Sequence, residues 1–220
     1  MSHAIIDIDT FMRAMLVADD VHTADVQLCI DGASDAIERW TNRRFLTADY
    51  EAWHDGTSTL RVADVYRADL YLADPDNGFA TLPVSAVTAV EEDGVALTPI
   101  LMHAGATLVD GESAVIFKER GIIRRATVSS GSISYTSWAT GIANVRVEYT
   151  AGYALEAMPE SLQRLCIHLT NMIYRESFRG GIASQVDMGA SVSYERLLPP
   201  WAKDIIASFQ LPGSPRTLAG

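Results

Sequence analysis

The adjacent residues His54 and Asp55 are the first candidates for chemistry in this sequence, because an imidazole and a carboxylate can act together as a general acid and base. The same stretch also suits a purely structural role. Asp55-Gly56 fits the tip of a β-hairpin, and Trp53 would then pack below the turn. We favour the hairpin turn. The alternative is a small hydrolase or transferase that uses His54, Asp55 or the acids near Glu91.

A second candidate is the run of acidic residues from Glu91 to Asp93, which resembles a carboxylate cluster for a metal ion. Consecutive residues of a strand point to alternate faces of a sheet, so the three carboxylates could not chelate one ion together. Gly94 follows directly and allows a tight turn. The run therefore predicts a solvated hairpin tip, and no metal site is expected.

The two cysteines offer neither a disulfide framework nor a zinc site. Cys29 and Cys166 are far apart in the sequence, and neither has a second ligand at metal-binding spacing. Cys166 and His168 fall on a predicted helix, where residues two positions apart point about 200° away from each other. They cannot form a nucleophile–base pair, so we expect both cysteines to be small reduced residues of the core.

The arginine doublets Arg43-Arg44 and Arg124-Arg125 are the only basic doublets. Neither is interleaved with aromatic residues in the sequence, so readout of a nucleic acid is not expected. Contact with an acidic protein partner is one interpretation of the two doublets. A solvated surface is the preferred one.

No longer motif supplies a reaction. The sequence lacks the glycine-rich patterns that cradle phosphates, GxGxxG and GxxxxGK[ST], and the GxSxG turn of serine esterases. The five histidines, at positions 3, 22, 54, 103 and 168, show no HExxH spacing. We therefore expect no catalytic residue, no cofactor and no enzymatic activity.

Composition narrows the class of protein further. The 220 residues carry a formal net charge of −11, which argues against sequence-independent binding to DNA or to an anionic membrane. Asp7 and Asp9 stand where a signal peptide would need basic residues, and no run of about 18 apolar residues could form a transmembrane helix. These features predict a soluble, intracellular, globular protein.

Apolar residues recur at helical spacing in four stretches. The first runs from Ile5 to Leu16 and has Asp7 or Asp9 as its cap; the second, longer one starts with Thr23 as the N-cap. The third opens at Pro159, and the last opens at Pro199-Pro200. The expected apolar stripes are Val26, Cys29, Ile30, Ala33, Ile37 and Trp40 in the second helix, Leu162, Leu165, Cys166, Leu169, Met172 and Ile173 in the third, and Trp201, Ile205 and Phe209 in the last.

Between residues 50 and 149 the pattern changes to short β-prone runs separated by turn signals such as Asp93-Gly94 and Ser129-Ser130-Gly131. The run from Asn144 to Tyr149 alternates apolar and polar residues, as a strand with one buried face does. Because no helical pattern separates these runs, we expect antiparallel hairpins. The predicted fold class is α+β: an antiparallel helical bundle scaffold with a β-hairpin-rich insert between the second and third main helices.

The predicted organisation is a single domain over residues 1–220. Its helical scaffold comprises about 1–46 and 154–210, the β-rich insert about 47–153, and an extended or disordered tail 211–220.

Four segments, taken in order, resemble the gp6-like head–tail connector (adaptor) proteins of tailed bacteriophages. The first is the end of the long early helix, Ile37 to Phe45, followed by the His54-Asp-Gly segment, and the second is Leu82-Pro-Val to Asp93-Gly94. The third and most specific is Trp138-Ala-Thr-Gly through Tyr149-Thr-Ala-Gly-Tyr153, which leads to Met158-Pro-Glu-Ser-Leu162. The fourth is Ser184 to Glu195 followed by Leu198-Pro-Pro-Trp to Ala207. The stretches 64–77 and 122–135 are longer than this pattern, so contacts made by them cannot be carried over.

This resemblance implies a structural virion protein with no catalysis. Such adaptors form rings, usually dodecamers, that dock beneath the portal protein, connect it to the stopper or tail-completion protein, and extend the channel through which DNA passes without specific binding. Their C-terminal region engages the portal, so Trp201, Ile205 and Phe209 are the expected portal contacts. The expected location is the neck of the virion, after synthesis in the cytoplasm of the bacterial host, with no membrane contact. Stoppers lean towards β-barrels, so the early helix pair and the proline-started helices favour an adaptor over another neck component.

Overall fold

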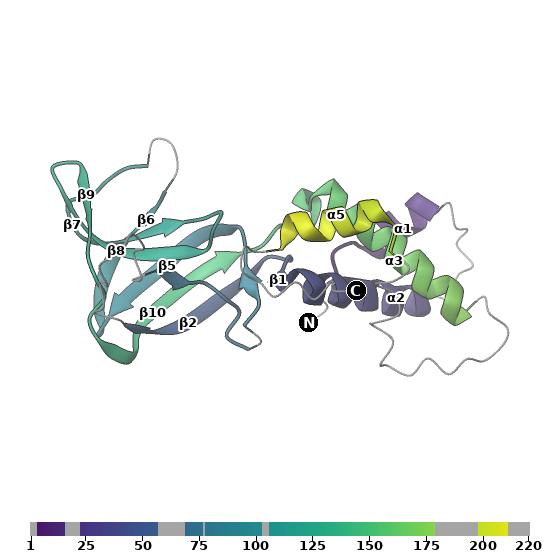
Figure 1. The fold of residues 1–220 in the computed structure, drawn as a ribbon, viewed down its shortest axis with the longest axis horizontal. Coiled ribbons are helices and arrows are strands. Elements are labelled where there is room, and N and C mark those ends of the chain that lie inside the picture. Colours follow the sequence, from purple (N-terminus) through teal and green to yellow (C-terminus); the bar gives the residue numbers. More distant parts are fainter. Residues whose placement is uncertain are drawn as a thin grey trace. The chain divides into compact units, whose positions relative to one another are not determined.

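The computed structural model describes residues 4–15, 23–56, 69–76, 78–102, 106–178 and 198–210. The chain divides into two compact units. One consists of Met1–Leu46 with Ala154–Gly220, and the other of Thr47–Tyr153. Figure 1 shows that the first unit contains the helices and the second the large sheet. The resembling segment 184–195 and the predicted tail 211–220 lie outside the described residues.

The first unit contains helices α1 (Ile8–Met15), α2 (Thr23–Thr41), α3 (Glu160–Phe178) and α5 (Pro200–Phe209), a short 3-10 helix η1 (Leu155–Ala157) and strand β1 (Arg43–Arg44). The backbone N–H of Thr10 donates to Asp7 Oδ1 at 2.6 Å, which confirms Asp7 as the cap of α1. Thr23, predicted as the cap of the second helix, is the first residue of α2.

The predicted helical stripes of α2 and α3 form the core of this unit. The two helices pack against each other, and most of the predicted residues are buried: Val26, Cys29, Ile30, Ala33, Ile37, Leu162, Leu165, Cys166 and Leu169. Trp40, Met172 and Ile173 are not fully buried. The spacing of apolar residues therefore identifies most of the two buried faces.

The second unit contains β2 (Ala48–Gly56), β3 (Leu70–Tyr71), β4 (Ala80–Thr81), β5 (Val84–Glu92), β6 (Val95–Leu101), β7 (Gly111–Phe117), β8 (Ile122–Ser129), β9 (Ser132–Tyr135) and β10 (Gly141–Ala151). Eight of these strands form one sheet in the order β2-β10-β5-β6-β7-β8-β3, with β9 also paired to β8. Figure 1 shows β10 running between β2 and β5. As predicted, Val145, Val147 and Tyr149 of β10 are buried.

The predicted fold class, an antiparallel helical bundle scaffold with a β-hairpin-rich insert, is wrong. Among the described residues the largest element is an eight-stranded mixed sheet, and the four helices do not make a bundle scaffold that carries it. Strands β6 and β7 are parallel, so the sheet is not a series of hairpins. Turn signals locate strands, but they carry no information on the long-range pairing that inserts β10 between β2 and β5.

Candidate functional site

Helix α5 carries the three residues predicted to contact a partner. The helix begins at Pro200, whose fixed φ suits a first helical turn, and Pro199 precedes it in an extended conformation. Its buried side chains are Ala202 and Ile206. The predicted stripe borders this buried face: Trp201 is 38% exposed, and Ile205 and Phe209 are both half-buried.

Phe209 packs inside the unit and fixes the end of α5. Its ring meets Phe45 edge to face, with ring centroids 5.7 Å apart. The guanidinium of Arg43 lies 5.3 Å from the centroid of Phe45 and 5.7 Å from that of Phe209, and its Nη1 donates to the Phe209 carbonyl at 3.2 Å. Gln210 Nε2 donates to the Trp40 carbonyl at 2.8 Å. These contacts join the end of α5 to the end of α2.

Trp201 is the member of the stripe that is most available to a partner. Its indole meets the ring of His168 on α3 edge to face, with centroids 5.2 Å apart. Trp201 is also one of the exposed large apolar side chains of the described residues. An exposed tryptophan held by a neighbouring ring is a typical anchor of a protein interface, because it buries a large area at a small entropic cost.

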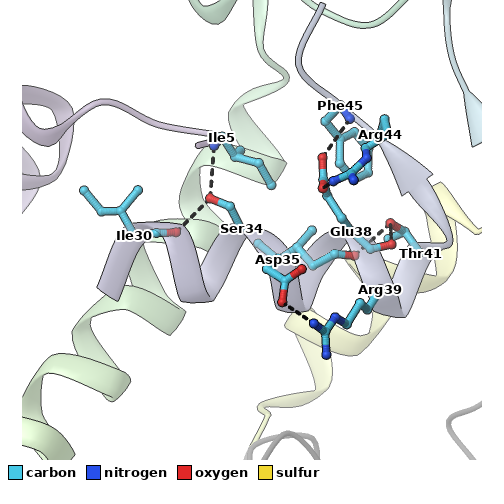
Figure 2. A network of polar contacts seen from close by, with 10 residues as sticks. Ile5, Ile30, Ser34, Asp35, Glu38, Arg39, Thr41, Arg44 and Phe45 are labelled. Carbon is cyan, nitrogen blue, oxygen red and sulfur yellow. Dashed lines mark hydrogen bonds and ion pairs between the residues drawn. The ribbon is translucent and has the colours of Figure 1, made fainter. Parts of the chain in front are cut away.

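A buried polar network at the end of α2 positions the segment that packs against Phe209. Figure 2 shows Glu38 reaching from α2 towards Arg44 and Phe45. Glu38 is fully buried; its Oε2 accepts a hydrogen bond from Arg44 Nη1, and its Oε1 accepts one from the Phe45 backbone N–H at 3.3 Å. Burial raises the pKa of the Glu38 carboxyl, and the Arg44 cation opposes that rise. The carboxylate thus holds the segment that carries Arg43 and Phe45.

A second polar contact in Figure 2 ties the N-terminal segment to α2. Ser34 Oγ donates to the Ile30 carbonyl at 2.8 Å and accepts a hydrogen bond from the Ile5 backbone N–H at 3.0 Å. Ser34 Oγ also lies 3.6 Å from Cys166 Sγ. The hydroxyl therefore satisfies a backbone donor in a region where Ile5 is fully buried.

Both cysteines are buried and free, as predicted for core residues. Burial raises the pKa of the Cys29 thiol and of the Cys166 thiol to about 11 each. At neutral pH almost no thiolate is present at either position. Neither cysteine therefore has the exposure or the ionisation that a nucleophile needs.

The structure corrects the expectation for His54, Asp55 and Trp53. Strand β2 continues through Gly56, which pairs with Gly141 of β10, so Asp55-Gly56 is not a hairpin tip. Trp53 is 55% exposed and does not pack below a turn. The predicted turn is wrong because Asp-Gly is a local signal, whereas β10 supplies a long-range partner that keeps these residues extended.

His54 and Asp55 are adjacent on strand β2, so their side chains point to opposite faces and not into a common site. His54 is half-buried, burial lowers the pKa of its imidazole, and its Nε2 is buried without a hydrogen-bond partner among the described residues. Asp55 is exposed, and its Oδ1 accepts a hydrogen bond from the Ala143 backbone N–H at 2.7 Å. This hydrogen bond stabilises the irregular stretch of β10 between Gly141 and Val145.

The hairpin tip predicted at Asp93-Gly94 is confirmed, but Glu92 is not solvated. Asp93 and Gly94 have φ values of 50° and 77°, as a two-residue hairpin turn requires. Glu92 is 7% exposed; its Oε2 accepts a hydrogen bond from Arg125 Nε at 2.6 Å and its Oε1 accepts one from the Ala139 N–H at 2.5 Å. The sequence signal that could have shown the burial of Glu92 is the two-residue repeat of a strand. Glu92 lies two residues after the buried Val90 and therefore on the same face of the sheet.

The arginine doublets also differ from the preferred interpretation as a solvated surface. Arg124 makes a bidentate ion pair with Asp69, at 2.5 and 2.9 Å, and Arg125 bonds Glu92, Glu112 and Thr136. Both arginines are only partly exposed. No aromatic residue stands next to them in the sequence, yet the fold puts Arg124 over the rings of Phe117 and Tyr135.

The outer face of β2, β10 and β5 carries an exposed cluster that sequence reasoning did not find. Arg146 of β10 donates to Glu51 of β2 at 2.8 Å, lies 3.5 Å from Glu91 of β5, and is bonded to Glu148. Its guanidinium also lies 5.9 Å from the centroid of Trp53. These carboxylates hold the pKa of Arg146 above its ordinary value. Strand register brings these residues together, and their spacing in the sequence does not reveal it.

No group of three or more His, Cys, Asp or Glu side chains in the described ranges could hold a metal ion. None of the helices within these ranges is long and apolar enough to cross a membrane.

The similarity of this chain to known proteins lies in its fold. No family model matches it, and no curated protein matches it. Among solved structures it resembles a chain from the neck of an empty GTA particle computed with C6 symmetry, with 17% sequence identity, a TM-score of 0.52, and coverage of 96% of this chain and 93% of that chain. A second match is to the neck of a native GTA particle computed with C12 symmetry, with 17% sequence identity, a TM-score of 0.48, and coverage of 95% of this chain and 94% of that chain. A third is to the virion of a native gene transfer agent (GTA) particle, with 16% sequence identity, a TM-score of 0.47, and coverage of 96% of this chain and 93% of that chain. At this identity the first likeness shows a shared fold over nearly the whole chain.

Proposed function

We propose that this protein is a structural component of the neck of a phage-like particle, and more specifically a head–tail adaptor. The observation that carries the proposal is the fold shared over 96% of the chain with a chain from a GTA neck. The sequence resemblance to gp6-like adaptors, from Ile37 to Ala207, supports the same conclusion independently. In this role the protein makes and breaks no bond, needs no cofactor, and resides in the virion after synthesis in the host cytoplasm.

The proposed assembly is a closed ring, and the resemblance to adaptors suggests twelve copies. The neck that contains the similar chain was computed with C6 symmetry, which suits a ring of identical subunits. A ring closes through heterologous interfaces, in which one face of a subunit meets a different face of the next. We further propose that the helical and β-rich units act together as one adaptor domain between the portal protein and the stopper or tail-completion protein.

The charge of the chain suits a channel for DNA. Each copy carries a formal net charge of −11, and a ring multiplies that charge around its axis. Among the 17 Lys and Arg residues, several arginines are paired with carboxylates, including Arg44, Arg124, Arg125 and Arg146. The net negative charge and these ion pairs both disfavour contacts with phosphates, so DNA would pass without being held.

Within this role, α5 is the proposed contact with the portal protein. Trp201 presents its indole at the surface, whereas Phe209 packs against Phe45 and sets the position of the helix. Ile205 lies between them on the same stripe. Trp201 would therefore make the larger part of the direct contact, and Phe209 would act mainly by holding α5 in place.

A second candidate is another neck component, such as a stopper or tail-completion protein. The observation that favours it is the eight-stranded sheet, because stoppers lean towards β-barrels. The adaptor is preferred, since the sheet unit is accompanied by α2 and α3, and these match the helices of the adaptor pattern.

The test is a reconstruction of the neck of particles that carry this protein. We expect a ring of this chain directly beneath the portal protein, with α5 against it. A ring in contact with the tail and not with the portal would favour the stopper. Absence of the chain from purified particles would refute both candidates. Isolated monomers in solution would not decide the question, because many adaptors stay monomeric until they meet the portal protein.

A further inference from the structure

Strand β2 forms one edge of the eight-stranded sheet. It is nine residues long and pairs along one side with β10, and no other described strand pairs with its second side. Such an edge presents a row of backbone N–H and C=O groups that another strand can pair with. Proteins commonly shield long edges with proline or with charged residues, lysine above all; β2 contains no proline or lysine, and its exposed charged residues are acidic.

The opposite edge of the sheet is built from two short strands. Strands β9 and β3 both pair with β8, β9 along its second half and β3 at its start. Exposed groups on this edge are Ser132, Ser134 and Tyr71, the last 64% exposed. The acid next to β3, Asp69, is neutralised by its ion pair with Arg124. This edge is therefore close to neutral.

The side chains of β2 argue against pairing of two β2 edges with each other. Asp49, Glu51 and Asp55 are exposed along the strand. Arg146 pairs with Glu51 but is shared with Glu91 and Glu148, so this face keeps a net negative charge. A symmetric pair would bring these carboxylates against the same carboxylates of the second copy, and like charges on facing strands repel. An edge without net charge, such as that of β9 and β3, has no such penalty.

Trp53 gives a second reason to expect a neighbour at this edge. It is 55% exposed on β2, with Arg146 of β10 beside it on the paired side. No described strand flanks it on the other side. A strand added to β2 would cover the open flank of the indole, and a covered tryptophan is a common centre of binding energy in an interface.

We infer that the free edge of β2 pairs with the edge formed by β9 and β3 of a second copy of this chain. The sheet would then continue from one subunit to the next, through two different faces as a ring requires. The inference rests on the proposed ring, and it assigns to the sheet unit a contact between subunits that is separate from the portal contact proposed for α5.

Cross-linking between two full-length variants tests the inference. Glu51→Cys places a thiol on the β2 edge, and Ser134→Cys places one on β9. Ala86→Cys, exposed on the interior strand β5, is the matched control. The native Cys29 and Cys166 are buried, so they add little background with a short bismaleimide. The variants are mixed or co-expressed and are probed both at rising protein concentration and in assembled necks.

We expect the E51C and S134C chains to cross-link to each other several times more than either does to A86C, with few E51C–E51C products. Sedimentation and the composition of the particles report assembly separately. If the copies assemble but E51C and S134C do not cross-link preferentially, or if E51C links mainly to itself or to another neck protein, the inference is wrong and the ring stands. If the copies assemble nowhere, the proposed function fails as well.

Discussion

At the scale of single residues, each of the two units contains a buried glutamate that accepts hydrogen bonds from an arginine and from a backbone N–H. Glu38 accepts hydrogen bonds from Arg44 and from the Phe45 N–H, and Glu92 accepts them from Arg125 and from the Ala139 N–H. Each carboxylate thus joins an arginine to the backbone of a connecting segment. Buried ion pairs add little net stability compared with apolar residues, but loss of one partner leaves a buried charge without compensation.

Glu92→Ala should therefore lower the free energy of unfolding by about 3 kcal/mol, since it leaves Arg125 without one of its carboxylates and the Ala139 N–H without its acceptor. Glu91→Ala is the matched control. Its ion pair with Arg146, at 3.5 Å, is partly exposed, and Arg146 keeps Glu51 and Glu148. The control should lose less than about 1 kcal/mol. Urea unfolding of both variants measures the difference, and equal losses would contradict the assigned role of Glu92.

The burial of His54 should make the stability of the protein depend on pH. Burial lowers the pKa of its imidazole below the ordinary value of 6.5, so between these two values the unfolded chain binds a proton that the folded chain does not. Stability should fall as the pH drops through about 6.5 towards the pKa of the folded state. In His54→Gln this loss should be absent, so as the pH falls the stability of the wild type should decrease relative to that of the variant. Thermal unfolding from pH 8 to pH 5 measures the difference, and a gap that does not change with pH would contradict the explanation.

At the scale of elements, local patterns predict what local forces determine. The stripes of α2 and α3 and the alternation of β10 are correct, because a buried face imposes the period of 3.6 or of 2 on the sequence. The hairpin tip predicted at Asp93-Gly94 is correct because both residues have positive φ values, which few residue types other than Gly, Asn and Asp adopt readily. The turn at Asp55-Gly56 and the bundle scaffold are wrong, because both depend on which strands pair over long distances.

Two glycines allow the same substitution to be tested with opposite expected signs. Gly94 has φ of 77° and open space where a Cβ would lie, so Gly94→Ala should lose about 1 kcal/mol through backbone strain alone. Gly32 lies exposed within α2, and an added Cβ would make only an ordinary contact with Ile173 at 4.0 Å. Gly32→Ala should gain up to about 1 kcal/mol from helix propensity. Denaturant unfolding of both variants measures the two shifts, and shifts of the same sign would contradict this account.

At the scale of the whole molecule, the candidate contact on α5 is only partly accessible to sequence reasoning. The spacing of Trp201, Ile205 and Phe209 locates one face of the helix, but it cannot distinguish an exposed anchor from a packed residue. That distinction depends on Arg43 and Phe45, which come from a distant part of the sequence and pack against Phe209. The exposed Arg146 cluster escapes sequence reasoning for the same reason, since three strands supply it.

This distinction leads to a prediction about assembly. Trp201→Ala should lower the free energy of unfolding by only about 1 kcal/mol, because the indole is 38% exposed and its packing within the unit includes the ring of His168. The same change should weaken binding to the portal protein roughly 30-fold, as loss of an interface anchor of about 2 kcal/mol does. Phe209→Ala should instead destabilise the fold by about 2 kcal/mol, since it removes the ring that packs against Arg43 and Phe45. Thermal unfolding and titration of each variant against the purified portal protein separate the two effects. If Trp201→Ala binds the portal like the wild type while Phe209→Ala stays fully stable, the assignment of α5 is wrong.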